Sequence, residues 1–166
     1  VTILKLKDLK TDKIITLVNT HLAFGKIEKR EAQVRKIMRL IKPLAKQGAV
    51  ILTGDLNTFP SWIEQEGFPF YDGDNIHRLL TAKGILSDAK TEALIGHLGP
   101  TGSFTNDPNN PEDHSPFKGE GTPGVMLDHI YISRGMQSIL HGTESGTIKG
   151  HYPSDHMPLI CDLLIK

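Results

Sequence analysis

A helix pattern that runs directly into a short, wholly apolar strand is the feature of this sequence that most limits its fold. Over residues 26–47, apolar side chains recur every three or four positions with charges between them, and Gly48 follows as a stop signal. Residues 49–53 form an uninterrupted apolar run, which is typical of a strand buried on both faces. Together these segments predict a layered α/β domain in which the helix packs beside a buried strand.

Strand patterns dominate the rest of the chain. Residues 1–7 and 14–19 are rich in β-branched and aliphatic side chains and flank a polar turn, which predicts a β-hairpin. Three further strands are predicted, over residues 102–105, 125–132 and 157–165. Strands therefore outnumber helices in the predicted fold.

Two segments near the middle of the chain interrupt this strand pattern. Residues 74–83 predict a short helix that is capped by Asp74 and ended by Gly84. Residues 106–124 contain four prolines and three glycines, so we expect an irregular loop there, either facing the substrate or simply flexible. Because the sequence has no internal repeat and no second-domain boundary, it predicts one domain over residues 1–166.

The charges of the chain cancel overall but are unevenly distributed. The sequence carries 19 basic and 19 acidic side chains, and residues 1–48 hold 12 of the basic and only 4 of the acidic ones. A net charge of zero removes the general attraction that many nucleic-acid-binding proteins gain from Lys and Arg. No apolar run approaches the roughly 20 residues required to cross a bilayer. Basic side chains on the outer face of the predicted helix are expected to be solvated: Lys29, Arg30, Lys36, Arg39 and Lys46.

Four short segments place polar side chains at the ends of apolar strands or inside them. In layered α/β folds, chemistry is built where strands open into loops. Taken singly, an Asp or Asn at a strand end most often caps a turn, and a lone His most often lies on the surface. The four segments are Asn19-Thr20-His21, Gly54-Asp55-Leu56-Asn57, Leu127-Asp128-His129 and Ser154-Asp155-His156.

Two of these segments suggest a chemical role from their residues alone. Strand alternation would direct Asp55 and Asn57 to the same side, where an ionised acceptor and an amide donor suit a phosphate and its attacking water. Asp128 stands in an otherwise apolar strand, where a carboxylate is costly unless it is paired. A histidine partner would satisfy Asp128, and the carboxylate would then fix the tautomer of the imidazole and stabilise its protonated form.

In order and spacing, the four segments resemble successive signature motifs of the endonuclease/exonuclease/phosphatase superfamily, whose fold is similar to that of pancreatic deoxyribonuclease. The resemblance implies a two-sheet α/β/β/α sandwich. It also implies a hydrolase of the phosphodiesterase or phosphatase type that depends on Mg²⁺, with Mn²⁺ as an alternative metal. Such an enzyme cleaves a phosphate ester by in-line attack of an activated water.

The resemblance also implies roles for individual residues. His156 and Asp128 would form the catalytic His–Asp pair, and Asp155 would lie beside the metal. Asn57 would hold a phosphate oxygen, and His21 would donate to the phosphate and stabilise the charge that builds there. Asp55 would orient or deprotonate the water, and both Asp55 and His156 qualify as the base.

The family's first half supplies an early Asn and a metal-binding Glu that have no counterpart in this sequence. We therefore expect the chain to be the C-terminal portion of the fold, with the missing N-terminal part as the partner that covers its exposed sheet faces and edges. Neutral charge and few aromatic residues favour a lipid or small-molecule phosphate ester slightly over nucleic acid. The alternative function is a catalytically silent remnant of the fold that acts as a binding or assembly module.

Overall fold

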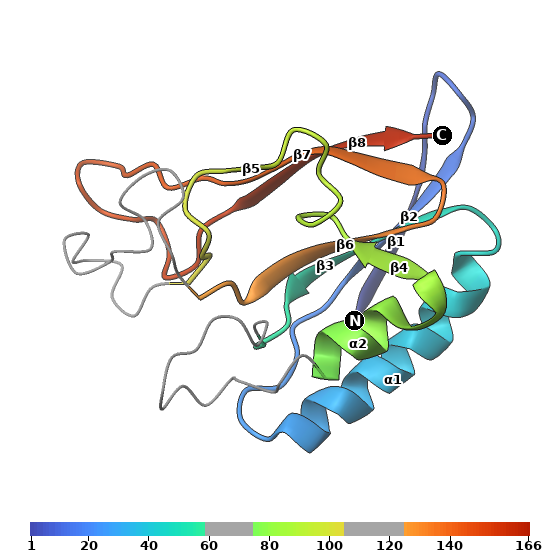
Figure 1. The fold of residues 1–166 in the computed structure, drawn as a ribbon, viewed down its shortest axis with the longest axis horizontal. Helices are drawn as coiled ribbons and strands as arrows, with labels where there is room; N and C mark the ends of the chain where they lie inside the picture. Colours follow the sequence, from blue (N-terminus) through green and yellow to red (C-terminus); the bar gives the residue numbers. More distant parts are fainter. Residues whose placement is uncertain (59–74, 105–124) are drawn as a thin grey trace.

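A computed structural model describes residues 1–58, 75–104 and 125–166 of the chain (Figure 1). The predicted loop over residues 106–124 and the predicted cap Asp74 lie outside the described residues. Within the described part, no helix is both long enough and apolar enough to cross a membrane.

Five strands form the larger sheet. Their order across the sheet is β1-β2-β3-β6-β4, and the pairing is antiparallel except between β2 and β3. A parallel pair requires a crossover, which the helix between β2 and β3 provides. The strands are β1 (Thr2–Lys7), β2 (Ile14–Asn19), β3 (Ala49–Asp55), β4 (Leu86–Asp88) and β6 (Asp128–Ser133).

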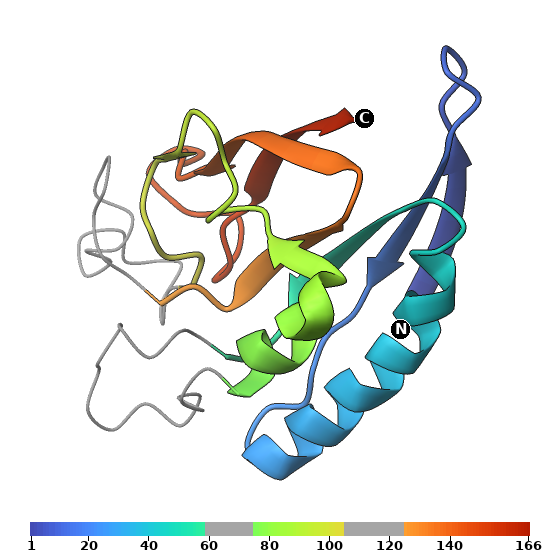
Figure 2. The same cartoon turned by 45° about the vertical axis from the view of Figure 1, so that its right-hand side comes forward.

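The described helices pack on one face of this sheet (Figure 2). They are α1 (Ile27–Leu44), α2 (Asn75–Thr81) and a 3₁₀ turn over Ala82–Gly84. The predicted helix over residues 26–47 is thus confirmed, although it ends three residues earlier. Its apolar stripe forms a core with the sheet whose buried members include Val18, Val34, Ile37, Ile41, Leu52, Leu80 and Tyr131.

Arg30 does not lie on the solvated face of α1. Its side chain is fully buried, and Nη1 donates to the carbonyl oxygen of Gly25 at 2.6 Å. The prediction of a solvated Arg30 was wrong because the side chain is buried and bonds to the backbone of Gly25, and helical periodicity alone does not show such a contact.

A smaller sheet lies on the other face of the larger one. It consists of β5 (His97–Leu98), β7 (Met136–Thr143) and β8 (Leu159–Ile165), in the order β5-β7-β8. Ile51, Ile130 and Ile132 of the larger sheet pack against Cys161 and Leu163 of the smaller one. The two-sheet α/β architecture is therefore confirmed, and in the described residues the helices cover only its larger sheet.

Several strand boundaries differ from the prediction. The strand predicted over 125–132 begins at Asp128, and the strand predicted over 157–165 begins at Leu159. Residues 102–104 form no strand and contribute only an isolated bridge between Phe104 and His156. Strand β7 was not predicted because Gln137, Ser138, His141 and Gly142 interrupt its apolar residues.

Apolar side chains remain exposed at the sheet edges. All six residues of the edge strand β1 are exposed, and Ile3 and Leu4 lie on opposite faces of it. On the smaller sheet, Ile160 and Leu164 of the edge strand β8 are also about half exposed, at 49% and 53%. Exposure of this kind matches the expectation that another polypeptide covers these edges, and such a partner stays a prediction.

Candidate active site

The larger sheet brings three of the predicted site residues to one edge. Parallel strands β2 and β3 end side by side, so the segment after β2, which carries His21, runs next to the end of β3, where Asp55 lies. Antiparallel β6 begins opposite the same point, and the register pairs Asp55 directly with Asp128. The sheet therefore places His21 and Asp128 beside Asp55, although they are 34 and 73 positions away from it in the sequence.

Gly54 makes this close approach of two chain segments feasible. Its φ is +134°, and a Cβ at this position would lie 1.8 Å from the carbonyl oxygen of Thr20. The backbone of the His21 segment can thus bond to β3, with Thr20 N donating to Thr53 O and Leu22 N donating to Asp55 O. Only glycine permits this contact, because any other residue would push His21 away from Asp55.

His156 reaches the same place from the segment before β8. Its Nδ1 donates to Oδ2 of Asp128 at 2.7 Å, which is the His–Asp pairing that the sequence predicted. Its Nε2 lies 3.9 Å from Oδ2 of Asp55, and the same carboxylate oxygen lies 3.2 Å from Nε2 of His21. The result is a continuous row of side chains, His21, Asp55, His156 and Asp128, which we call the His–Asp row.

Burial and charge within the His–Asp row shift two pKa values upward. The hydrogen bond from His156 to Asp128 is the main reason that the pKa of His156 is raised, because it favours the protonated imidazole. Burial is the main reason that the pKa of Asp55 is raised, and the nearby Asp128 adds to the effect. The Asp55 side chain is only 14% exposed, whereas that of His21 is 73% exposed. The row therefore opens to solvent at His21.

Asn57 is placed differently from the prediction. It lies beyond β3 with a left-handed φ of +48°, so strand alternation does not apply to it. Its backbone N–H donates to Oδ1 of Asp55 at 2.7 Å, and its Nδ2 donates to the carbonyl oxygen of Leu22 at 2.8 Å. Asn57 is buried and holds the Asp55 and His21 segments together, so a role on the phosphate stays a prediction.

Asp155 is exposed beside the His–Asp row. Ser154 Oγ donates to its Oδ1 at 3.3 Å, and its negative charge contributes to the raised pKa of His156. Among the described residues, no group of three or more His, Cys, Asp or Glu side chains is arranged to hold a metal ion. The metal role of Asp155 stays a prediction.

Two further residues contact the His–Asp row, and sequence reasoning missed the first of them, Ser103. Ser103 Oγ donates to Oδ2 of Asp128 at 2.8 Å. The ring of Phe104 packs on the ring of His156, with centroids 5.0 Å apart. No local signal distinguishes this Ser, because its contact spans 25 positions and residues 102–105 predicted an ordinary strand.

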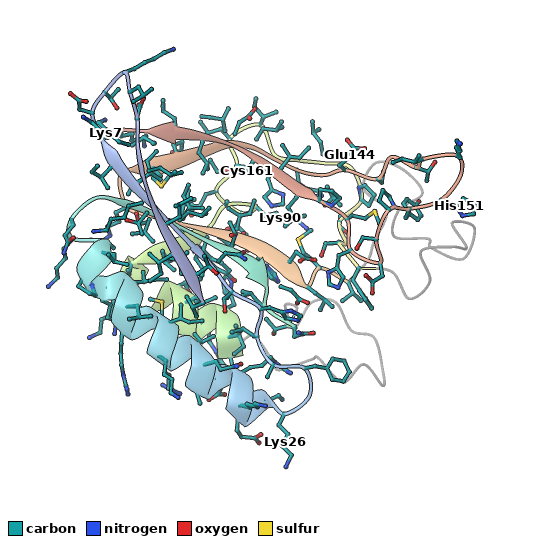
Figure 3. The ribbon with its side chains drawn as sticks, turned by 180° about the vertical axis from the view of Figure 1, so that it is seen from behind. Lys7, Lys26, Lys90, Glu144, His151 and Cys161 are labelled. Carbon is teal, nitrogen blue, oxygen red and sulfur yellow. The ribbon has the colours of Figure 1, made fainter. Side chains whose placement is uncertain are left out.

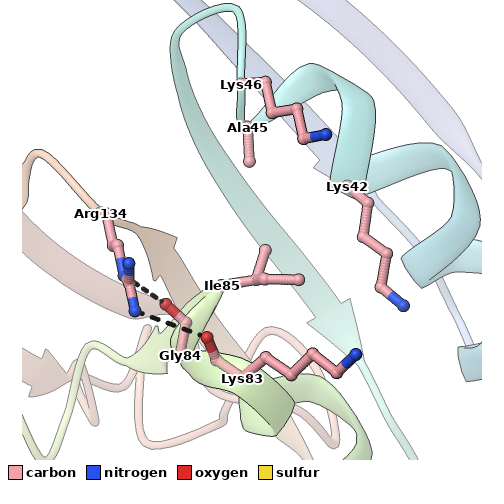
Figure 4. A pocket seen from close by; sticks show the side chains of 7 residues that line it. All are labelled: Lys42, Ala45, Lys46, Lys83, Gly84, Ile85 and Arg134. Carbon is pink, nitrogen blue, oxygen red and sulfur yellow. Dashed lines mark hydrogen bonds between the residues drawn. The ribbon is translucent and has the colours of Figure 1, made fainter.

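A basic cleft lies away from the His–Asp row, near the C-terminal end of α1 (Figure 4). It has a volume of about 290 Å³, and its lining includes Lys42, Lys46, Lys83 and Arg134. Arg134 Nε donates to the carbonyl oxygen of Gly84 at 2.9 Å. Lysines at the end of a helix are favoured by the helix dipole, so these cations have a structural explanation and we assign the cleft no ligand.

Comparison with known proteins gives a different result for sequence and for structure. The sequence matches no family model and no curated protein. The structure resembles an endonuclease/exonuclease/phosphatase protein from Bacteroides vulgatus, with a TM-score of 0.73 and 22% identity over 98% of this chain and 54% of that one. It also resembles the mannosyl-6-phosphatase of Bacteroides thetaiotaomicron, with a TM-score of 0.69 and 22% identity over 95% and 54% of the two chains. A third similar structure is TDP2 of D. rerio with a single-strand DNA product, with a TM-score of 0.67 and 15% identity over 98% and 60%.

These likenesses show that the chain has the endonuclease/exonuclease/phosphatase fold. The resemblance inferred from the four polar segments is therefore confirmed for the fold. The chain spans about half the length of the two Bacteroides proteins.

Proposed function

We propose that this protein is a phosphoesterase that hydrolyses a phosphate mono- or diester with water. The observation that carries the proposal is the His–Asp row, in which four side chains from four separate segments meet at one sheet edge. The fold shared with a phosphatase and with TDP2 supports the same chemistry. It supports the reaction class rather than a particular substrate.

The chemistry of the row suggests a role for each member. Asp55 would accept the proton of the attacking water, because its raised pKa makes the carboxylate a better base than an exposed Asp. His156, kept protonated by Asp128, would place a positive charge where negative charge builds on the phosphate. His21, exposed at the end of the row, would donate to a phosphate oxygen. This assignment favours Asp55 over His156 as the base.

Mg²⁺, with Mn²⁺ as an alternative, remains part of the proposal. Carboxylate oxygens are the ligands that Mg²⁺ prefers, and Asp155 is an exposed carboxylate next to His156. The remaining ligands would have to come from outside the described residues, since these hold no group of three candidate ligands. The roles proposed for Asp55, His156 and His21 involve only the protein's own side chains.

The substrate class is open between small or lipid phosphate esters and nucleic acid. The neutral net charge favours the former slightly, because a polyanionic substrate is usually met by an excess of Lys and Arg. Phe104, which packs on His156, would border the leaving group.

A panel of phosphate mono- and diesters tests the proposal. The panel should include a sugar phosphate, a phosphoinositide, sphingomyelin and single-stranded DNA, each measured with Mg²⁺, with Mn²⁺ and with a chelator. We expect hydrolysis of at least one class that stops when the metal is removed. If the folded protein hydrolyses none of them under any metal condition, it is a binding or assembly module instead.

A further inference from the structure

The hydroxyl group of Ser103 has a fully determined hydrogen-bonding arrangement. Ser103 is completely buried, and its Oγ accepts from the backbone N–H groups of Leu127 and Asp128, both at 3.1 Å. A hydroxyl group can accept two hydrogen bonds and donate one. The two backbone N–H groups occupy both acceptor positions, so the remaining hydrogen bond of Ser103 is the one that it donates. That hydrogen is donated to Oδ2 of Asp128 at 2.8 Å. The same hydroxyl thus binds both the backbone and the carboxylate of Asp128.

Oδ2 of Asp128 is also the oxygen that accepts the hydrogen bond from His156 Nδ1. It accepts from Ser103 Oγ at 2.8 Å and from His156 Nδ1 at 2.7 Å. Free rotation of the carboxylate would break both bonds, so Ser103 opposes the rotation that would separate Asp128 from His156.

The backbone around Ser103 connects the two halves of the His156–Asp128 pair. On one side, Ser103 N donates to the carbonyl oxygen of Val125 at 2.9 Å. On the other side, Met157 N donates to the carbonyl oxygen of Ser103 at 2.7 Å, and Phe104 forms a bridge with His156. Ser103 therefore lies between the segment that carries Asp128 and the segment that carries His156, and it contacts both.

We propose that Ser103 is a positioning residue, which holds Asp128 in the orientation that pairs it with His156 and so sets the turnover of the site. The proposal rests on the proposed phosphoesterase function and adds a residue that acts through Asp128 rather than on the substrate. A purely structural serine would affect stability only. Ser103 should affect the geometry of His156 as well.

The test compares Ser103→Ala with a matched buried serine. Ser133 is 2% exposed and lies in β6, the strand that carries Asp128, and its Oγ accepts from Val50 N at 2.8 Å. Ser133→Ala therefore removes a buried serine hydroxyl at a position that has no contact with the His–Asp row. Ser103→Thr keeps the hydroxyl and serves as the rescue variant. The readouts are kcat and KM, the urea midpoint, and the downfield proton resonance of His156 Nδ1–H by NMR.

We expect Ser103→Ala to lower kcat about tenfold with little change in KM, because even a small displacement of a catalytic group from its productive position lowers turnover substantially. The His156 Nδ1–H resonance should shift or broaden in Ser103→Ala and return in Ser103→Thr. Ser133→Ala should lower the urea midpoint without changing kcat or that resonance.

The proposal is overturned if the resonance is unchanged in Ser103→Ala, whatever the activity. It is also overturned if Ser133→Ala, at an equal loss of stability, lowers kcat as much. The NMR signal requires no substrate, so the two proposals can fail separately. If the protein has no hydrolytic activity but Ser103→Ala changes the resonance, the proposed function is contradicted. The orientation of Asp128 by Ser103 is then still supported.

Discussion

Replacing His156 by alanine is expected to lower kcat for phosphate-ester hydrolysis about 100-fold or more, which is the usual contribution of a group that exchanges a proton or stabilises charge in the transition state. His156 is the only member of the His–Asp row that faces two carboxylates, at 2.7 Å from Asp128 and 3.9 Å from Asp55. Its removal would take away the imidazole that lies between the two carboxylates and leave Asp128 without its histidine partner.

Folding should survive this substitution. The His156 side chain is 29% exposed, so truncation leaves a space that water can enter rather than a sealed cavity. The measurement is kcat together with the urea midpoint for the variant and its parent. His151→Ala is a matched control, because His151 lies on the surface of the same segment, away from the core (Figure 3). Parental turnover in His156→Ala would contradict the assignment of this row as the active site.

The second large effect concerns the acid sensitivity of folding. His141 of β7 is 1% exposed, and its Nδ1 lies 2.8 Å from Nδ1 of His97. His97 Nε2 donates to the carbonyl oxygen of Pro100 at 2.7 Å, so in neutral His97 the other ring nitrogen, Nδ1, accepts a hydrogen bond from His141 Nδ1. The neighbouring Lys90 is half-buried, and burial lowers its pKa. Burial is the main reason that the pKa of His141 is lowered to about 3, and the nearby His97, Lys90 and His129 lower it further.

A lowered pKa of this kind makes the folded state less stable in acid. The unfolded chain binds a proton at His141 near pH 6.5, but the folded chain does not until about pH 3. This contribution is therefore fully present above pH 6.5 and is lost progressively as the pH falls toward 3. Over that interval the loss is on the order of 5 kcal/mol, a large part of the stability of a domain of this size.

His141→Asn isolates this effect, because its amide group keeps a donor for His97 and does not titrate. The free energy of unfolding should be measured in urea at several pH values between 7 and 4 for the parent, for this variant and for His151→Asn. We expect the parent and His151→Asn to lose stability in parallel and His141→Asn to lose clearly less. If the free energy of unfolding depends on pH equally in all three proteins, the folded state binds a proton at His141 as readily as the unfolded chain does. That result would contradict the lowered pKa of His141.

Local patterns in the sequence were sufficient for the main elements of the fold. The periodicity of α1 and the apolar run of β3 depend on neighbouring residues only, and both are observed. A histidine partner for Asp128 was also predictable, because a carboxylate in an apolar strand requires a partner, and the family resemblance identified that partner as His156. Strands β5 and β7 were not, since polar residues interrupt β7 and β5 has only two residues.

The finer geometry of the site depends on contacts between distant segments. The left-handed backbone of Asn57 turns its amide toward Leu22, and strand alternation gives no sign of this. Arg30 is buried because the chain around Gly25 closes over it. The Ser103 hydroxyl acquires its role only when residues 103 and 128 meet in the fold. None of these three contacts leaves a periodic signal in the sequence.

Isotope incorporation tests the central claim most directly. A substrate selected from the ester panel should be hydrolysed in water enriched in ¹⁸O, and the products should be analysed by mass spectrometry. Attack of water on phosphorus at the His–Asp row predicts one ¹⁸O atom in the phosphate group of the product and none in the released alcohol. The label in the alcohol, or no hydrolysis of any ester by the folded protein, would contradict the account.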